Sequence, residues 1–142
     1  MKNLIRPLLL GALGSLLLVA AGGCGGKGLV SAKGRLTYKG QPVPSTTVIF
    51  HPDEDGKRAS HGLTDDDGNF SLTNSMEDRG VFLGHHKVTL KYHMSAAEET
   101  REIPPKASKE LREVIARFQD LKTTTLQVDI TGSGQFIELK LD

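Results

Sequence analysis

The chain contains one cysteine and no tryptophan, and its basic and acidic side chains nearly balance. A single cysteine has no partner within the chain, which excludes a disulfide-stapled scaffold. The formal charge is only +1. The chain therefore lacks the excess of basic residues that nucleic-acid-binding proteins carry, and no nucleic-acid partner is expected. The apolar run from Leu8 to Val19 is shorter than the roughly 20 residues that a membrane-spanning helix needs.

The amino-terminal segment has the layout of a secretory signal. Lys2 and Arg6 precede the apolar run, and small residues occupy positions 20–23. Residues 1–23 are therefore predicted to be a signal peptide. Its removal would leave 119 of the 142 residues and take away two basic and no acidic side chains, so the formal charge would change from +1 to −1.

Cys24 directly follows the small residues, and Ala21-Gly22-Gly23-Cys24 resembles a bacterial lipobox. The resemblance implies cleavage before Cys24 and acylation, with palmitate or a similar chain, of the thiol and the new amino terminus. Two or more acyl chains anchor a protein stably. Residues 24–28, rich in glycine, would form a flexible tether. The alternative is a free or disulfide-forming cysteine after an ordinary signal.

Residues 29–142 alternate apolar and polar side chains with the period of half-buried β-strands. Around seven short strands of this kind predict a single domain, a mainly β antiparallel sandwich. Turn signals containing glycine lie at 39–42, 65–68 and 131–134, and the last two are typical of hairpins.

One segment departs from this alternation. Leu111, Val114, Ile115 and Phe118 recur at helical spacing after Ser108, the candidate N-cap. A short helix is therefore predicted near residues 106–118. It is expected to cover an edge of the sandwich, and a partner-binding surface is the alternative.

Three motifs follow one another along the chain: Gly34-x-Leu36-x-Tyr38-x-Gly40-x-Pro42-x-Pro44, Thr64-Asp65-x-Asp67-Gly68-x-Phe70 and Gly84-x-x-Lys87-Val88-Thr89. In this order and spacing they resemble the carboxypeptidase regulatory-like domains. The chain is also similar in overall form to the small planctomycete lipoproteins of this type. The resemblance implies a seven-stranded, transthyretin-like sandwich.

Five residues are predicted to be structural turn residues. Gly40 and Pro42 punctuate the first hairpin, because glycine adopts positive φ easily and proline cannot extend a hydrogen-bond ladder. Asp65 and Asp67 are expected to accept backbone N–H groups, and Gly68 to supply a left-handed residue. A calcium loop is disfavoured, because an EF-hand register with Gly68 sixth places non-carboxylate residues at both ends.

The five histidines raise the question of a metal site. His85 and His93 are eight residues apart, which is about 26 Å along a strand, too far to share one ion. The favoured interpretation is a hydrogen-bonded core residue, His86, with solvated histidines elsewhere and no metal or other cofactor. A zinc site of His51, His61 and one of the other three histidines is the alternative.

No catalytic residues are predicted. Hydroxyisourate hydrolases, which share the transthyretin-like fold, end in Tyr-Arg-Gly-Ser, whereas this chain ends in Leu139-Lys140-Leu141-Asp142. Intradiol dioxygenases bind iron through two tyrosines and two histidines, but Tyr38 and Tyr92 are predicted core residues. No serine lies in a glycine elbow.

The sequence thus predicts a non-catalytic, lipid-anchored module of the cell envelope, held in the inner or outer membrane through Cys24. Its predicted role is structural or the binding of an envelope protein or polysaccharide. A carbohydrate- or metal-binding envelope protein is the alternative. Sugar-binding faces usually carry aromatic platforms, and here only Phe82, Phe118 and Phe136 fall outside the predicted core positions.

Overall fold

The computed structural model describes residues 28–142. The predicted signal peptide, Cys24 and all but the last residue of the predicted tether lie outside the described residues. The described chain is mainly β, as predicted. Its elements are β1 (Leu29–Val30), β2 (Ala32–Tyr38), β3 (Gln41–Pro42), β4 (Thr46–Pro52), β5 (Ser60–Leu63), β6 (Asn69–Ser71), β7 (Val81–Phe82), β8 (Gly84–Tyr92), α1 (Ala96–Glu99), α2 (Lys109–Ala116), β9 (Gln127–Ile130) and β10 (Gln135–Lys140).

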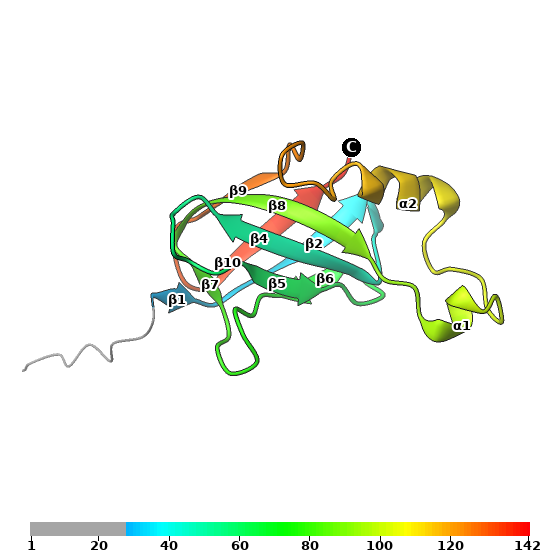
Figure 1. The fold of residues 1–142 in the computed structure, drawn as a ribbon, viewed down its shortest axis with the longest axis horizontal. Helices are drawn as coiled ribbons and strands as arrows, with labels where there is room; N and C mark the ends of the chain where they lie inside the picture. Colours follow the sequence, from blue (N-terminus) through cyan, green and yellow to red (C-terminus); the bar gives the residue numbers. More distant parts are fainter. Residues whose placement is uncertain (1–27) are drawn as a thin grey trace, which may run out of the picture.

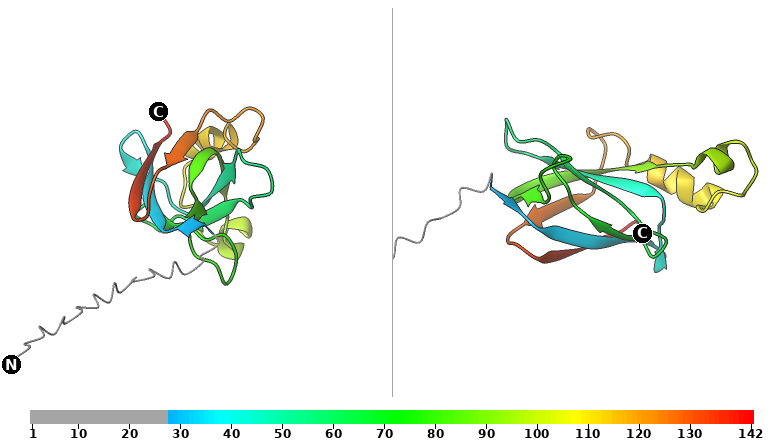
Figure 2. Two further views of the ribbon diagram at one scale, coloured as in Figure 1. Left: turned by 90° about the vertical axis from the view of Figure 1, so that its left-hand side faces the viewer. Right: turned by 90° about the horizontal axis from the view of Figure 1, so that it is seen from below.

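Two four-stranded sheets form the layers of a sandwich (Figures 1 and 2). In the first, the β2 sheet, β10 and β3 flank β2, and β6 also pairs with β2, on the side away from β10. In the second, the β4 sheet, the order is β5-β4-β8-β9. Apolar side chains of both sheets meet in one core, and β1 pairs with β7 in a separate short sheet.

The strand count and the pairing differ from the prediction. The described residues form ten strands in three sheets, of which β1, β3 and β7 have two residues each. The prediction of exclusively antiparallel pairing is wrong, because β10 runs parallel to β2 from Gln135↔Ala32 to Lys140↔Thr37. The predicted hairpin at 131–134 is also wrong. That segment connects β9 in one sheet to β10 in the other, and a crossover can place a strand parallel to a much earlier one.

The turn at 39–42 forms a hairpin, whereas the hairpin predicted at 65–68 is wrong because that turn connects two sheets; after both turns the chain enters the opposite layer. β2 and β3 form a tight hairpin through Thr37↔Pro42 and Tyr38↔Gln41, after which β4 lies in the other sheet. In the turn at 65–68, Asp65 N–H donates to the Asn69 carbonyl over 2.9 Å. The strands on either side, β5 and β6, nevertheless belong to different sheets.

The predicted helix is confirmed as α2. Its N-cap is Ser108, whose hydroxyl accepts the Leu111 N–H over 3.1 Å, and it buries Val114 and Ile115. A second helix, α1, was not predicted. It begins after Ser95, which forms a reciprocal capping box with Glu98. The two helices form a helical lobe, residues 95–117, beyond one end of β4 and β8 (Figure 1).

Candidate functional site

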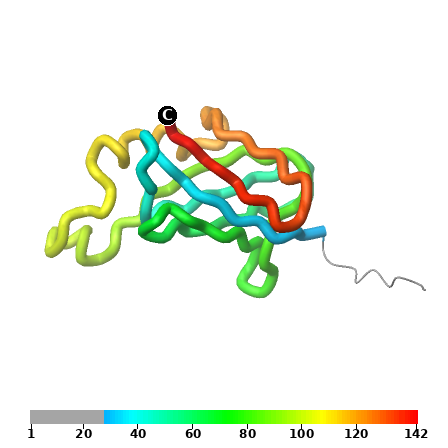
Figure 3. Tube along the Cα trace, turned by 180° about the vertical axis from the view of Figure 1, so that it is seen from behind, coloured from blue at the N-terminus to red at the C-terminus, as the bar shows by residue number. Residues whose placement is uncertain are grey.

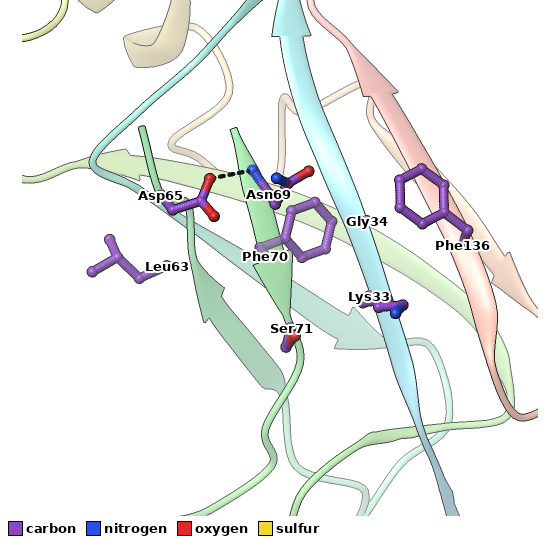
Figure 4. A pocket seen from close by; sticks show the side chains of 8 residues that line it. All are labelled: Lys33, Gly34, Leu63, Asp65, Asn69, Phe70, Ser71 and Phe136. Atoms are coloured by element: carbon purple, nitrogen blue, oxygen red, sulfur yellow. Dashed lines mark hydrogen bonds between the residues drawn. The ribbon is translucent and has the colours of Figure 1, made fainter. Parts of the chain in front are cut away.

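A groove of about 540 Å³ lies on the β2 sheet beside β6 and β10 (Figure 4). Its apolar borders include Phe136 and Leu63, whose side chains are 55% and 59% exposed. Polar groups between them belong to Lys33, Asn69 and Ser71. Gly34, Asp65 and Phe70 complete the lining.

The alternation of β10 explains why Phe136 faces solvent. Ile137 and Leu139 are each 4% exposed and join the core, so Phe136, Glu138 and Lys140 point to the outer face of the sheet. Phe136 lies opposite Lys33 of β2. An exposed aromatic ring beside a lysine provides both apolar contact area and a positive charge for a ligand.

Of the predicted turn residues at 65–68, Asp65 lines this groove. The Asp65 carboxylate accepts the N–H groups of Asp67 and Asn69 through Oδ1, over 2.9 and 2.8 Å (Figure 4 shows the second bond). Gly68 has φ +77°, and a Cβ there would lie 2.5 Å from the Leu36 carbonyl oxygen. Asp67 contributes its backbone, since its carbonyl accepts the Arg35 Nε–H over 3.0 Å.

The other two predicted turn residues lie in the β2–β3 hairpin. Gly40 has φ +76°, and Pro42 pairs with Thr37 as the last residue of β3. Val43 N–H then donates to the Leu36 carbonyl over 3.0 Å before the chain leaves the sheet. Both turns thus form hydrogen bonds to residues of β2, at Arg35 and Leu36. Lys33 of the same strand lines the groove.

In the described part of the chain, β10, which contributes Phe136 to the groove, has a free edge on its side away from β2. Within residues 28–142, β2 is the only strand that pairs with β10, and Figure 3 shows the two side by side. Leu141 donates its N–H to the Thr37 carbonyl over 2.9 Å, and a Cβ on Gly34 would clash with the Ile137 carbonyl oxygen. The backbone N–H and C=O groups of the odd-numbered residues of β10 therefore point toward β2. Because backbone groups alternate along a strand, those of Phe136, Glu138 and Lys140 face the free side.

The side of β8 that faces away from β4 is covered by the chain itself. β9 pairs only with residues 84–87 of β8. Beyond them, the carbonyls of Leu126 and Phe118 accept the N–H groups of Val88 and Leu90, each over 2.9 Å. The Thr124 hydroxyl donates to the Val88 carbonyl over 2.6 Å. We call residues 118–126 the closing segment.

The histidines occupy separate places. His86 is 1% exposed, bonds the Gly84 carbonyl through Nδ1 over 3.0 Å, and packs against Phe50. Burial lowers the pKa of His86. Burial also lowers the pKa of His51, whose Nε2 forms a hydrogen bond with the Thr89 hydroxyl over 2.9 Å. The hydrogen bond from His85 Nδ1 to the Asp129 carboxylate, at 2.7 Å, raises the pKa of His85.

These positions do not assemble a metal centre. Among residues 28–142, no group of three or more His, Cys, Asp and Glu side chains is arranged to hold a metal ion. Asp129 meets Nδ1 of His85, whereas Asp53 lies 3.9 Å from Nε2. The two carboxylates therefore approach opposite sides of the ring and do not converge on one point.

The two tyrosines, predicted to be core residues, are half-buried and bonded to glutamates of the helical lobe. Tyr38 donates to Glu110 over 2.8 Å and Tyr92 to Glu98 over 3.0 Å. Glu98 also accepts the backbone N–H groups of Ser95 and Lys106, each over 2.6 Å. Those backbone bonds lower the pKa of Glu98 to about 2. The sequence signal for this role was the capping-box spacing from Ser95 to Glu98.

Comparisons with protein-family models, with curated proteins and with solved structures find no match to this chain. Within the part of the chain that the structure describes, neither helix has the length and apolar character needed to span a bilayer. The groove and the open edge of β10 are the surface features that bear on function.

Proposed function

We propose that this protein is a non-catalytic, lipid-anchored module of the cell envelope, and that it binds protein through a surface that we call the β10 site. The β10 site consists of Phe136, Glu138 and Lys140 together with the adjoining groove. The observation that carries the proposal is the unpaired β10 edge beside an exposed aromatic ring. An open edge presents rows of N–H and C=O groups to which an extended segment of a partner can add as a further strand.

The fold supports assignment to the carboxypeptidase regulatory-like domains as part of the same proposal. Without the two-residue strands β1, β3 and β7, seven strands remain, and they lie in the two layers of the sandwich. We propose that these seven are the transthyretin-like framework that the sequence motifs imply. In such a scaffold, fold does not determine activity, so the function must come from a particular surface.

The proposed anchor has a direct test of its own. Mass spectrometry of the amino-terminal peptide from native membranes is expected to find Cys24 as the first residue, carrying acyl chains. A Cys24→Ser chain is expected to leave the membrane fraction. An unmodified thiol on a soluble chain would overturn the anchor and leave a secreted binding domain.

A polysaccharide is the second candidate ligand, and the groove is the observation that favours it. Phe136 offers a ring face, and Lys33, Asn69 and Ser71 offer hydrogen-bonding groups beside it. Binding sites for sugars combine such apolar and polar surfaces. A glycan ligand would lose affinity on Phe136→Ala but would not require the backbone groups of β10.

Photo-crosslinking distinguishes these candidates. A photoreactive phenylalanine analogue is placed at position 136 of the full chain in its native host, with the same analogue at exposed Leu121 as control. A protein adduct of discrete mass from position 136 alone is the expected result. A heterogeneous glycan adduct would favour the polysaccharide, and equal or absent adducts at the two positions would overturn the β10 site.

A further inference from the structure

The β10 strand carries opposite charges two residues apart on the same exposed face. Glu138 and Lys140 point outward, whereas Ile137, Leu139 and Leu141 are buried. Within residues 28–142, neither Glu138 nor Lys140 has an ion-pair partner within 4.0 Å. Arg35, opposite Glu138 on β2, instead directs its Nε–H to the Asp67 carbonyl.

We propose that the partner strand at the β10 edge is β10 of a second copy of this chain, paired antiparallel with Glu138 opposite Lys140. This inference rests on the proposed function and names its partner. A twofold axis then passes between the two Leu139 residues, and the Glu138–Lys140 pair occurs twice. Opposite charges directly across an antiparallel pair stabilise it, and like charges destabilise it.

The backbone groups of β10 are oriented to form hydrogen bonds in this antiparallel register. Phe136, Glu138 and Lys140 turn their N–H and C=O groups to the free side, so Glu138 and Lys140 of opposing strands form a hydrogen-bonded pair. On the inner face, Ile137 lies opposite Leu141. Apolar residues therefore meet apolar residues, and the two cores continue across the joined sheet.

The charges also select the register. A shift that places Glu138 opposite Glu138 brings like charges together, and a further shift places Glu138 opposite Phe136. Neither pairs the lysine with the glutamate. Only even shifts keep the apolar residues on the inner face, because a shift by one residue would turn them outward.

The association state of the full chain, purified in detergent, tests the proposal by light scattering over a concentration series. A concentration-dependent dimer is expected, because a single pair of short strands gives a small interface. Glu138→Lys and Lys140→Glu should each weaken it about tenfold or more. The double variant, E138K with K140E, should restore it, because the exchanged charges again oppose each other.

Glu102→Lys is the matched control, since Glu102 is an exposed glutamate on the helical lobe. It makes the same charge change away from β10 and should leave the dimer unchanged. A monomer at all concentrations, or a dimer indifferent to both single reversals, would overturn the self-pairing. If position 136 still crosslinks to a different protein, the proposed function stands while this inference fails.

A crosslink reports the register itself. Chains carrying Glu138→Cys mixed with chains carrying Lys140→Cys should form an intermolecular disulfide, whereas Glu138→Cys chains alone should form much less. The unaltered chain controls for any disulfide through Cys24. Equal crosslinking in the mixed and unmixed samples would contradict the register.

Discussion

β8 and β10, one strand from each sheet, differ in how the backbone groups on their outer sides are bonded. At β8 the chain returns through α2 and the closing segment, whose carbonyls accept the N–H groups of Val88 and Leu90. At β10 the backbone groups on the outer side have no such cover within the described residues. Open edges invite association and are commonly blunted or covered. In our proposal, the covered side of β8 serves folding and the open edge of β10 is available to a partner.

Ile115→Ala should have the largest effect, because it loosens the helix that leads into the closing segment. Ile115 is fully buried, and truncation of a buried isoleucine to alanine costs about 2–5 kcal/mol. Chemical denaturation of the full chain should show this loss, and hydrogen exchange should show faster exchange at Val88 and Leu90. Unchanged stability would contradict the role of α2 at this edge.

Thr124→Val should have the next largest effect. The substitution keeps the shape but removes the hydroxyl that donates to the Val88 carbonyl, within a residue that is 7% exposed. Leaving a buried partner without its bond costs about 1–3 kcal/mol. Exposed Thr123→Val is the control, and an equal effect in both variants would show that the bond at Val88 is unimportant.

Acid should loosen the helical lobe before the sandwich. The pKa of Glu98 is lowered from its ordinary value of 4.5 to about 2, chiefly by the Ser95 and Lys106 N–H groups. Because the folded pKa is depressed, this contribution is present above pH 4.5 and is lost as the pH falls toward 2. Hydrogen exchange should rise first at residues 95–106, and Glu98→Gln should remove this pH dependence. Simultaneous opening of the lobe and β4 would contradict it.

Phe136→Ser should have the smallest effect on stability. Its ring is 55% exposed, and surface substitutions usually change stability by about 0.5 kcal/mol or less. Partner binding should nevertheless fall, which crosslinking from a photoreactive probe at position 138 would measure. Loss of stability comparable with that of Ile115→Ala would show that Phe136 is a packing residue.

The local features of the fold could be predicted from the sequence, and the long-range pairing could not. Alternation locates most of the longer strands, and Ser108 marks the start of α2. The glycines at 131–134 indicate a turn but do not reveal that the next strand joins the other sheet, because a turn signal reports only nearby residues. Parallel pairing of β10 with β2 depends on how distant strands bury their apolar faces.

The candidate site was predictable only in part for the same reason. The sequence locates the turn residues Asp65 and Gly68 and leaves Phe136 outside the predicted core. The open edge becomes visible only when β10 is placed at the margin of its sheet. Alternating charges are ordinary on any exposed strand face. The proposed pairing of Glu138 with Lys140 of a second copy therefore follows only from the position of β10 at the edge.

Residue-by-residue amide hydrogen exchange of the dilute full chain tests the contrast between the two edges most directly. The N–H groups of Phe136, Glu138 and Lys140 should exchange rapidly, while those of Val88 and Leu90 remain protected. Slow exchange at all five positions would show that the β10 edge is already covered, and would contradict its availability to a partner.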